Sequence, residues 1–293
     1  MLKEMTVSSI IQFIEDNLET KLINIDDLVL YSGYSRRYLQ MTFKEYVGIP
    51  VGKYIRVRRA SRAAALLKLS KMTIIEISEK LFYDSQQTFT REFKKIFGYT
   101  PRQYRITPFW SFDNILGRRS INDVYPKPQI CYLKGRKVAG KCFDFRELVI
   151  YSGVNSKKRW ENIYNSLKNN GFVTVSNRIP FHDNDKNILA RTVVWKDAEI
   201  SNCDIQINSG LYAHFSFCGT LDEYVKNMYN IYYNSLPLYK LSKREDYDIE
   251  IIKKKENNNI TYHYFLPIHC DDLTLQYCEM LSGSGCLMPP LPV

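Results

Sequence analysis

The chain has no long apolar run and few of the residues that build disulfide or metal sites. No segment approaches the roughly 18 to 20 apolar residues of a membrane-spanning helix. Its first residues carry acids inside the apolar stretch, which excludes a secretory signal peptide. The seven cysteines are odd in number and none form a C-x-x-C pair, which argues against a disulfide framework and a structural zinc site. We therefore expect a cytoplasmic protein without a membrane partner, metal or cofactor.

Sequence signatures of catalysis are also missing. We find no nucleophile–base arrangement, no metal-ligand spacing and no phosphate-binding glycine loop. We therefore do not expect an enzyme. With 293 residues, of which 45% are hydrophobic and 25% charged, the chain has the composition of a globular protein and the length for two cores.

Acidic residues are scarce in one part of the chain. Residues 35–107 hold sixteen Lys and Arg against five Asp and Glu, whereas residues 1–34 hold two against six. The formal net charge of +10 is therefore concentrated in about seventy residues. Such a concentration is typical of a surface that binds a polyanion. Charge alone leaves open a basic surface that is only solvated.

The basic segment contains an internal repeat at an offset of fifty residues. Residues 34–55 and 84–105 align so that Ser35 meets Ser85 and Gly48 meets Gly98. Each serine is predicted to cap a helix start, and each glycine to end that helix in the left-handed conformation. Apolar residues recur between them with helical spacing: Leu39, Phe43, Tyr46 and Val47 in the first copy and Phe89, Phe93, Ile96 and Phe97 in the second.

A second helix is predicted before each of these two. It follows Asn24 in the first copy and Thr73 in the second, where Thr73 and Glu76 have capping-box spacing. Helix, short turn and helix thus occur twice, which is the helix-turn-helix arrangement. The alternative is a plain helical domain whose polar faces only contact water.

The polar face of each second helix carries residues suited to duplex DNA. Arg and Gln can read guanine and adenine in the major groove, while Lys and Thr suit phosphates. The predicted DNA-binding residues are Arg36, Arg37, Gln40, Met41 and Lys44 in the first unit, and Gln86, Gln87, Thr90, Arg91, Lys94 and Lys95 in the second. Lys53 and Arg56 are further expected phosphate contacts.

Between the two units, residues 50–69 predict one continuous helix. Twenty residues at about 1.5 Å each give a length of about 30 Å. Successive major grooves on one face of the duplex lie about 34 Å apart. One chain is therefore expected to span two half-sites as a monomer.

These motifs resemble the AraC/XylS family of transcription activators, in its right-origin-binding subgroup. The resemblance is carried by G33-Y34-S35, Y54-I55-R56 and D84-SQQTFTREFKKIFGYTPRQYR, and it covers residues 6–108. It implies that the second helix of each unit enters the major groove and that the protein recruits RNA polymerase at the bacterial nucleoid. Two positions depart from the family: Arg37 stands where these activators usually have Trp, and Met41 where they usually have Arg.

The second half changes to aromatic and β-branched runs with two predicted helices, typical of an α+β domain. Residues 210–237 and 247–268 resemble the gyrase-inhibitor-like effector-binding domain. That resemblance implies a cleft for a small amphipathic or cationic ligand. We expect this cleft to be lined by Trp195, Tyr212, Phe215, Tyr232 and His263. His263 stands where relatives often carry an acid.

The predicted fold is thus an all-α double helix-turn-helix domain followed by an α+β gyrase-inhibitor-like domain. The expected boundaries are 1–107 for the DNA-binding domain, 108–125 for a linker, 126–270 for the effector domain and 271–293 for a disordered tail. The leading functional interpretation is a sequence-specific transcription activator. The alternatives are a DNA-coating or gyrase-inhibiting protein that does not activate transcription, and a second domain that hydrolyses small molecules.

Overall fold

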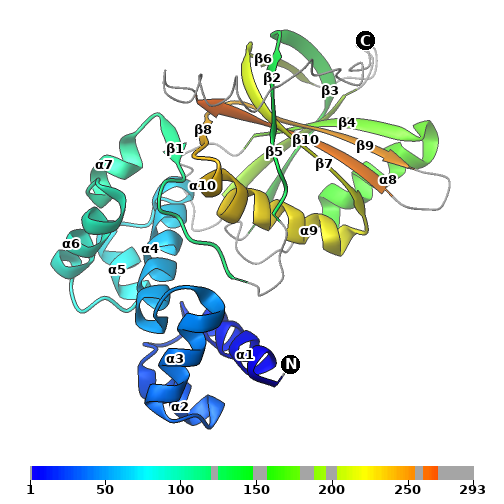
Figure 1. Ribbon diagram of the computed structural model, residues 1–293. Helices are drawn as coiled ribbons and strands as arrows, with labels where there is room; N and C mark the ends of the chain where they lie inside the picture. Colours follow the sequence, from blue (N-terminus) through cyan, green and yellow to red (C-terminus); the bar gives the residue numbers. More distant parts are fainter. Residues whose placement is uncertain are drawn as a thin grey trace. The chain divides into compact units, whose positions relative to one another are not determined.

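The computed structural model describes residues 2–119, 125–147, 157–178, 188–195, 203–254 and 260–269 (Figure 1). The chain divides into two compact units. The first holds the residues up to Thr107 together with Asn114–Arg119, and the second holds Pro108–Asp113 together with the described residues from Tyr125 onward. The residues expected to form a linker are therefore shared between the two units. The predicted tail lies outside the described residues.

All the regular secondary structure described in the first unit is helical, as the sequence predicted. Its helices are α1 (Leu2–Asn17), α2 (Ile25–Ser32), α3 (Arg36–Val47), α4 (Val51–Leu69), α5 (Ile74–Lys80), α6 (Gln86–Phe97) and α7 (Pro101–Ile106). Two helix pairs, α2–α3 and α5–α6, form the helix-turn-helix units, and α4 runs between them (Figure 1).

The predicted helix ends are confirmed. The Ser35 hydroxyl accepts a hydrogen bond from the backbone N–H of Tyr38, and that of Ser85 accepts one from the N–H of Thr88. Gly48 and Gly98 end α3 and α6 at φ of 83° and 78°. The two copies of the repeat thus have the same local structure. In each, the cap satisfies a backbone group that has no hydrogen-bond partner within the helix.

Helix α4 is the central element of the first unit. Its nineteen residues give a length of about 28 Å at about 1.5 Å each. Nearly all of its side chains from Arg58 onward are buried, three basic ones among them. Each of these has acceptors of the chain itself: Arg58 pairs with Glu15, Arg62 pairs with Glu19, and Lys68 donates to the carbonyl oxygen of Thr107 at 2.7 Å.

The second unit is a curled antiparallel sheet with helices. Its strands are β1 (Phe109–Ser111), β2 (Gln129–Leu133), β3 (Arg136–Glu147), β4 (Phe172–Arg178), β5 (Ile188–Trp195), β6 (Cys203–Ile207), β7 (Gly210–Gly219), β8 (Ser242–Arg244), β9 (Asp248–Lys254) and β10 (Ile260–His269). Its helices are α8 (Lys157–Asn170), α9 (Leu221–Asn230), a π-helical turn (Ile231–Ser235) and α10 (Leu236–Leu238).

Strand β10 organises this sheet. It pairs with β7 along Ile260–Pro267, with β9 along Ile260–Phe265, and with β8 through its last two residues. The neighbours of β9 follow in the order β4, β5, β3 and β6, while β2 pairs with β7. The strands that the sequence predicted are confirmed, but β4, β6 and the short β1 and β8 had not been expected.

The two faces of the sheet have separate cores because side chains alternate along a strand. One core contains Val193, Tyr212, Ile249, Ile251 and Phe265, among others. The other joins the opposite face to α8 and α9 and contains Trp160, Val175, Val194, Tyr224 and Tyr262, among others.

In the part of the chain that the structure describes, no helix is both long and apolar enough to span a bilayer.

Candidate nucleic-acid interface

Helix α3 presents one polar and one buried face. Leu39, Thr42 and Phe43 are buried, whereas the predicted DNA-binding residues of this helix are all exposed: Arg36, Arg37, Gln40, Met41 and Lys44. The helix begins at Arg36, so the first of these side chains lie in its first two turns. Arg36 forms an exposed ion pair with Asp26 of α2 at 2.5 Å.

Helix α6 repeats this arrangement with a more aromatic core. Phe89, Phe93 and Phe97 are buried, and the ring centroids of Phe93 and Tyr104 lie 5.3 Å apart. The polar face carries the remaining predicted DNA-binding residues. Gln86, Gln87, Arg91, Lys94 and Lys95 are exposed and Thr90 is half-buried. The glutamines occupy the first two positions of the helix, the part that a helix-turn-helix directs at base edges.

Apart from Arg36, the exposed basic side chains of both helices differ from the buried ones of α4, because no ion pair among the described residues involves them. Among the described residues, no ion pair involves Arg37, Lys44, Arg91, Lys94 or Lys95. Their charge is therefore directed to solvent and is available to an anionic partner.

Helix α4, which runs between the two helix-turn-helix units, is held to α1 by a buried polar cluster. Both carboxylate oxygens of Glu15 accept from Arg58, at 2.8 and 2.6 Å, and one also accepts from the Tyr54 hydroxyl at 2.9 Å. Burial, and next the nearby carboxylate of Glu15, raises the pKa of Tyr54 above its ordinary value. A cluster with this many fixed bonds ties α1 to α4.

A segment that sequence reasoning treated as linker also belongs to this unit. Asn114–Arg119, which we call the strap, lies along α4. The backbone N–H of Leu116 donates to the Ser61 hydroxyl at 2.9 Å, and the N–H of Arg119 donates to the Tyr54 hydroxyl at 3.3 Å. Arg58 also donates to the carbonyl oxygen of Leu116. No sequence motif marks the strap, because its contacts join residues 55 to 65 positions apart.

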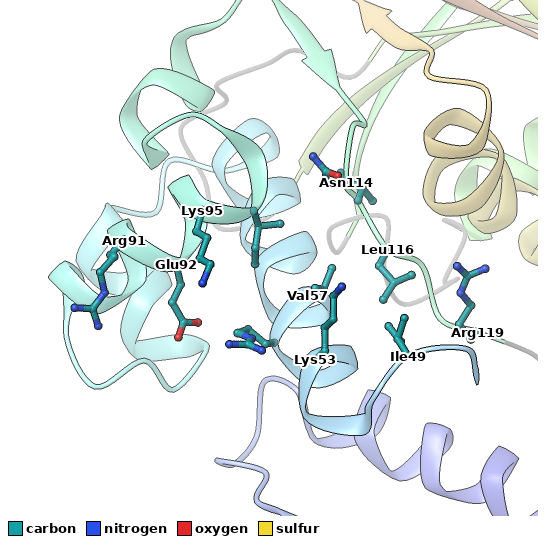
Figure 2. A pocket seen from close by; sticks show the side chains of 12 residues that line it. Ile49, Lys53, Val57, Arg91, Glu92, Lys95, Asn114, Leu116 and Arg119 are labelled. Carbon is teal, nitrogen blue, oxygen red and sulfur yellow. The ribbon is translucent and has the colours of Figure 1, made fainter. Parts of the chain in front are cut away.

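The strap, α4 and α6 together border a groove with a volume of about 810 Å³ (Figure 2). Figure 2 shows Arg91, Glu92 and Lys95 on α6 at one side of α4, and Leu116 and Arg119 on the strap at the other. The groove residues are Ile49, Lys53, Arg56, Val57, Arg91, Glu92, Lys95, Ile96, Asn114, Ile115, Leu116 and Arg119. Four predicted DNA-contacting side chains therefore share one surface: Lys53 and Arg56 of α4, and Arg91 and Lys95 of α6.

The residues expected to line an effector cleft are divided by the sheet. Tyr212, Trp195 and His263 lie on the face of the first core, where Trp195 packs against that core. Phe215 pairs with Tyr264 on the opposite face, and the Tyr232 hydroxyl lies 2.9 Å from that of Tyr264. The five side chains therefore do not line one face of the sheet. Tyr212 and Phe215 are three residues apart on one strand, and residues separated by an odd number point to opposite faces of a sheet. Their spacing alone therefore predicts that they do not share a face.

Two buried carboxylates that sequence reasoning missed lie on the helix-covered face. Glu250 accepts from Arg159 at 2.6 Å, from Asn177 at 2.5 Å and from the Tyr224 hydroxyl at 3.0 Å. Asp248 accepts from Lys243 and from the hydroxyls of Tyr232 and Tyr264. Each carboxylate is thus satisfied by donors of this chain. No local motif reveals them, since Arg159 and Glu250 are 91 positions apart.

His263 has a partner that was also not foreseen. Its Nδ1 lies 3.2 Å from Nε2 of His214 on the neighbouring strand, and His214 stacks on Phe265 with ring centroids 4.4 Å apart. Burial, and next the charge of His263, lowers the pKa of His214 to about 4. Burial, and next the charge of Lys253, also lowers the pKa of His263. Both rings are therefore neutral near pH 7.

Comparison with known proteins agrees with this division of the chain. Residues 28–106 match a helix-turn-helix domain family, and residues 126–269 match the GyrI-like small molecule binding domain. The F1 operon positive regulatory protein of Yersinia pestis is 66% identical over 281 residues, which cover 96% of this chain and 93% of that protein. This chain belongs to the AraC/XylS family of transcription regulators.

Two further comparisons cover most or part of the chain. The right origin-binding protein of Escherichia coli K12 is 26% identical over 257 residues, covering 83% of this chain and 89% of that protein. The C-terminal domain of AraT, a response regulator from Geobacillus stearothermophilus, matches 34% of this chain and 83% of its own length at 30% identity and a TM-score of 0.33. The two domain matches and the Yersinia relative confirm the expected two-domain fold and the DNA-binding regulatory function of this AraC/XylS chain.

Proposed function

We propose that this regulator binds its operator as a monomer, with the first turns of α3 and α6 in successive major grooves. The observation that carries the proposal is the pair of exposed, capped recognition helices at the two ends of a 19-residue helix. At about 28 Å, α4 is close to the spacing of about 34 Å between grooves on one face of the duplex.

Base reading is assigned to Arg37, Gln40, Gln86, Gln87 and Arg91, the side chains best suited to base edges. Met41 faces the bases beside them, and the other predicted contacts position the helices: Arg36 and Lys44 on α3, and Thr90, Lys94 and Lys95 on α6. Because Arg37 and Met41 replace the usual family residues at base-facing positions, the half-site read by α3 is expected to differ from that of other members.

Footprinting of the full chain across the genome of its host tests this assignment. The expected footprint covers two half-sites whose centres lie about one helical turn apart. A single half-site per footprint, or none, would contradict the use of both helices.

We further propose that the bound protein activates transcription by recruiting RNA polymerase. The name of the Yersinia relative, a positive regulator of an operon, supports activation. Transcription in vitro with purified polymerase and an operator-bearing promoter separates this from a protein that only coats DNA or inhibits gyrase. Activation by the full chain is expected, and repression or no effect would favour the alternative.

The second unit is proposed to bind a small amphipathic ligand, without catalysing its conversion. The match to a small molecule binding domain supports this role. Glu250 and Asp248 are already saturated by internal donors, so an organic cation would find no free buried carboxylate among the described residues. A neutral or anionic ligand is therefore favoured, on the face that carries Trp195, Tyr212 and His263.

Thermal-shift screening with fatty acids, bile acids and cationic dyes tests the ligand class. Stabilisation by the first two classes is expected, because a ligand that binds only the folded state raises the melting temperature. A response to cationic dyes alone would contradict the charge argument, and no response from any class would contradict ligand binding.

A further inference from the structure

The groove over α4 contains an excess of unpaired positive charge. Four exposed basic side chains and the half-buried Arg119 surround it, against the single acid Glu92. Among the described residues, no ion pair involves any of the basic side chains that line it: Lys53, Arg56, Arg91, Lys95 and Arg119. An anionic occupant would therefore meet little competition from the protein's own carboxylates.

The groove also has an apolar floor. Ile49, Val57, Ile96 and Leu116 are only partly buried, and Ile115 is 5% exposed. An occupant with both anionic and apolar groups fits this combination. The DNA backbone has this character, since charged phosphates alternate with deoxyribose rings whose carbon atoms are apolar.

Arg119 is half-buried at the edge of this groove. Its buried Nε atom donates to no acceptor among the described residues. Its backbone is fixed at the same time, because its N–H donates to Tyr54, which itself donates to Glu15. Because the side chain of Arg119 lines the groove and its backbone is fixed, its guanidinium group suits a phosphate oxygen.

We propose that the groove binds the sugar–phosphate backbone of the operator between the two half-sites, and that Arg119 donates to one phosphate. The DNA-binding unit then extends to Arg119 and includes the strap. This inference rests on the mode of DNA binding proposed above.

Salt dependence of binding tests the inference, because each phosphate contact adds about 0.9 to the slope of log affinity against log salt. Arg119→Gln and Arg119→Lys are compared with the wild type in the full chain, on the footprinted operator and on a random duplex of equal length. Arg102→Gln is the matched control, because Arg102 is an exposed arginine on α7 outside the groove. Thermal melting verifies that the variants remain folded.

We expect Arg119→Gln to lower the slope by about 0.9 on both duplexes. Arg119→Lys and Arg102→Gln should keep the wild-type slope. An unchanged slope for Arg119→Gln would overturn the inference, as would an equal loss for Arg102→Gln. If the wild type bound neither duplex, the proposed function itself would fail. If the wild type bound DNA and Arg119→Gln left the slope unchanged, only the inference about the groove would fail.

Discussion

At the scale of single residues, burial separates two kinds of basic side chain that the sequence counts alike. Arg58, Arg62 and Lys68 are buried, and each donates to a carboxylate or a carbonyl oxygen of the chain. Arg37 and Arg91 are exposed and form no ion pair among the described residues. The positive charge available to DNA is therefore smaller than the count of Lys and Arg in residues 35–107 implies.

Arg91→Ala is expected to weaken operator binding by about 1–3 kcal/mol, the usual cost of one lost base contact. The measurement is a gel shift at fixed salt on operator and random duplexes. Because a base contact exists only on the operator, the loss on random DNA should be much smaller. Lys71→Ala removes an exposed charge outside both recognition helices and serves as the control. Equal losses on the two duplexes would assign Arg91 to the phosphates instead.

The neutral His214–His263 pair predicts a dependence of stability on pH. The pKa of His214 is lowered to about 4, whereas the unfolded chain has an ordinary histidine pKa near 6.5. Between these values the unfolded chain binds more protons, so stability falls as the pH falls from about 6.5 towards 4.

Urea unfolding of the second unit across that pH range measures the effect. His214→Gln should flatten the dependence, and His269→Gln, which changes an exposed histidine at the end of β10, should leave it as in the wild type. A slope that persists in His214→Gln would show that other groups are responsible.

At the scale of elements, caps and buried charges have different roles. Caps at Ser35 and Ser85 and glycines at the C-termini decide where α3 and α6 begin and end. The ion pair between Glu15 and Arg58 holds α1 to α4, and through the carbonyl oxygen of Leu116 it also holds the strap. The caps thus set the ends of the recognition helices, whereas the buried charges hold α1 and the strap to α4.

Arg58→Met is expected to destabilise the first unit by about 3–5 kcal/mol, because it leaves the Glu15 carboxylate buried without its partner. The double variant Glu15→Leu/Arg58→Met should recover much of this loss, since it removes both charges. Urea unfolding followed by the helical circular dichroism signal measures both. A double variant as unstable as the single one would show that packing, rather than the unpaired charge, causes the loss.

At the scale of the whole molecule, the chain passes between its units more than once. It enters the second unit at Pro108, where Trp110 and Phe112 are buried in the second unit, and it returns to the first unit at Asn114. The expected boundary at residue 107 would leave the strap outside the DNA-binding unit. We propose Arg119 as the functional end of that unit.

A single chain should occupy one operator, because each copy carries both recognition helices. Sedimentation of the full chain with an operator duplex is expected to give one protein per duplex across the concentration range of specific binding. A duplex that carries two operators in inverted orientation is the control, because it should bind two copies of the protein. Two copies bound cooperatively to one operator would contradict the monomeric arrangement.

The helix-turn-helix half was predicted closely and the effector half less so. Helix ends depend on caps and glycines a few residues apart, which the sequence displays directly. The lining of the effector cleft depends on which strands pair and in which register. Phe215 and Tyr232 were therefore grouped with Tyr212 and His263, although the sheet separates them. The networks of Glu250 and Asp248 were missed because their partners come from distant elements.

The sequence by itself determined the repeat, the recognition helices, the length of α4 and the concentration of positive charge, because each of these arises from local spacing and composition. Only the tertiary structure decided which basic residues remain free, that residues 114–119 lie along α4, and which aromatic residues share a face. The physical reason is that burial and pairing arise from contacts between residues tens of positions apart, which local spacing does not encode.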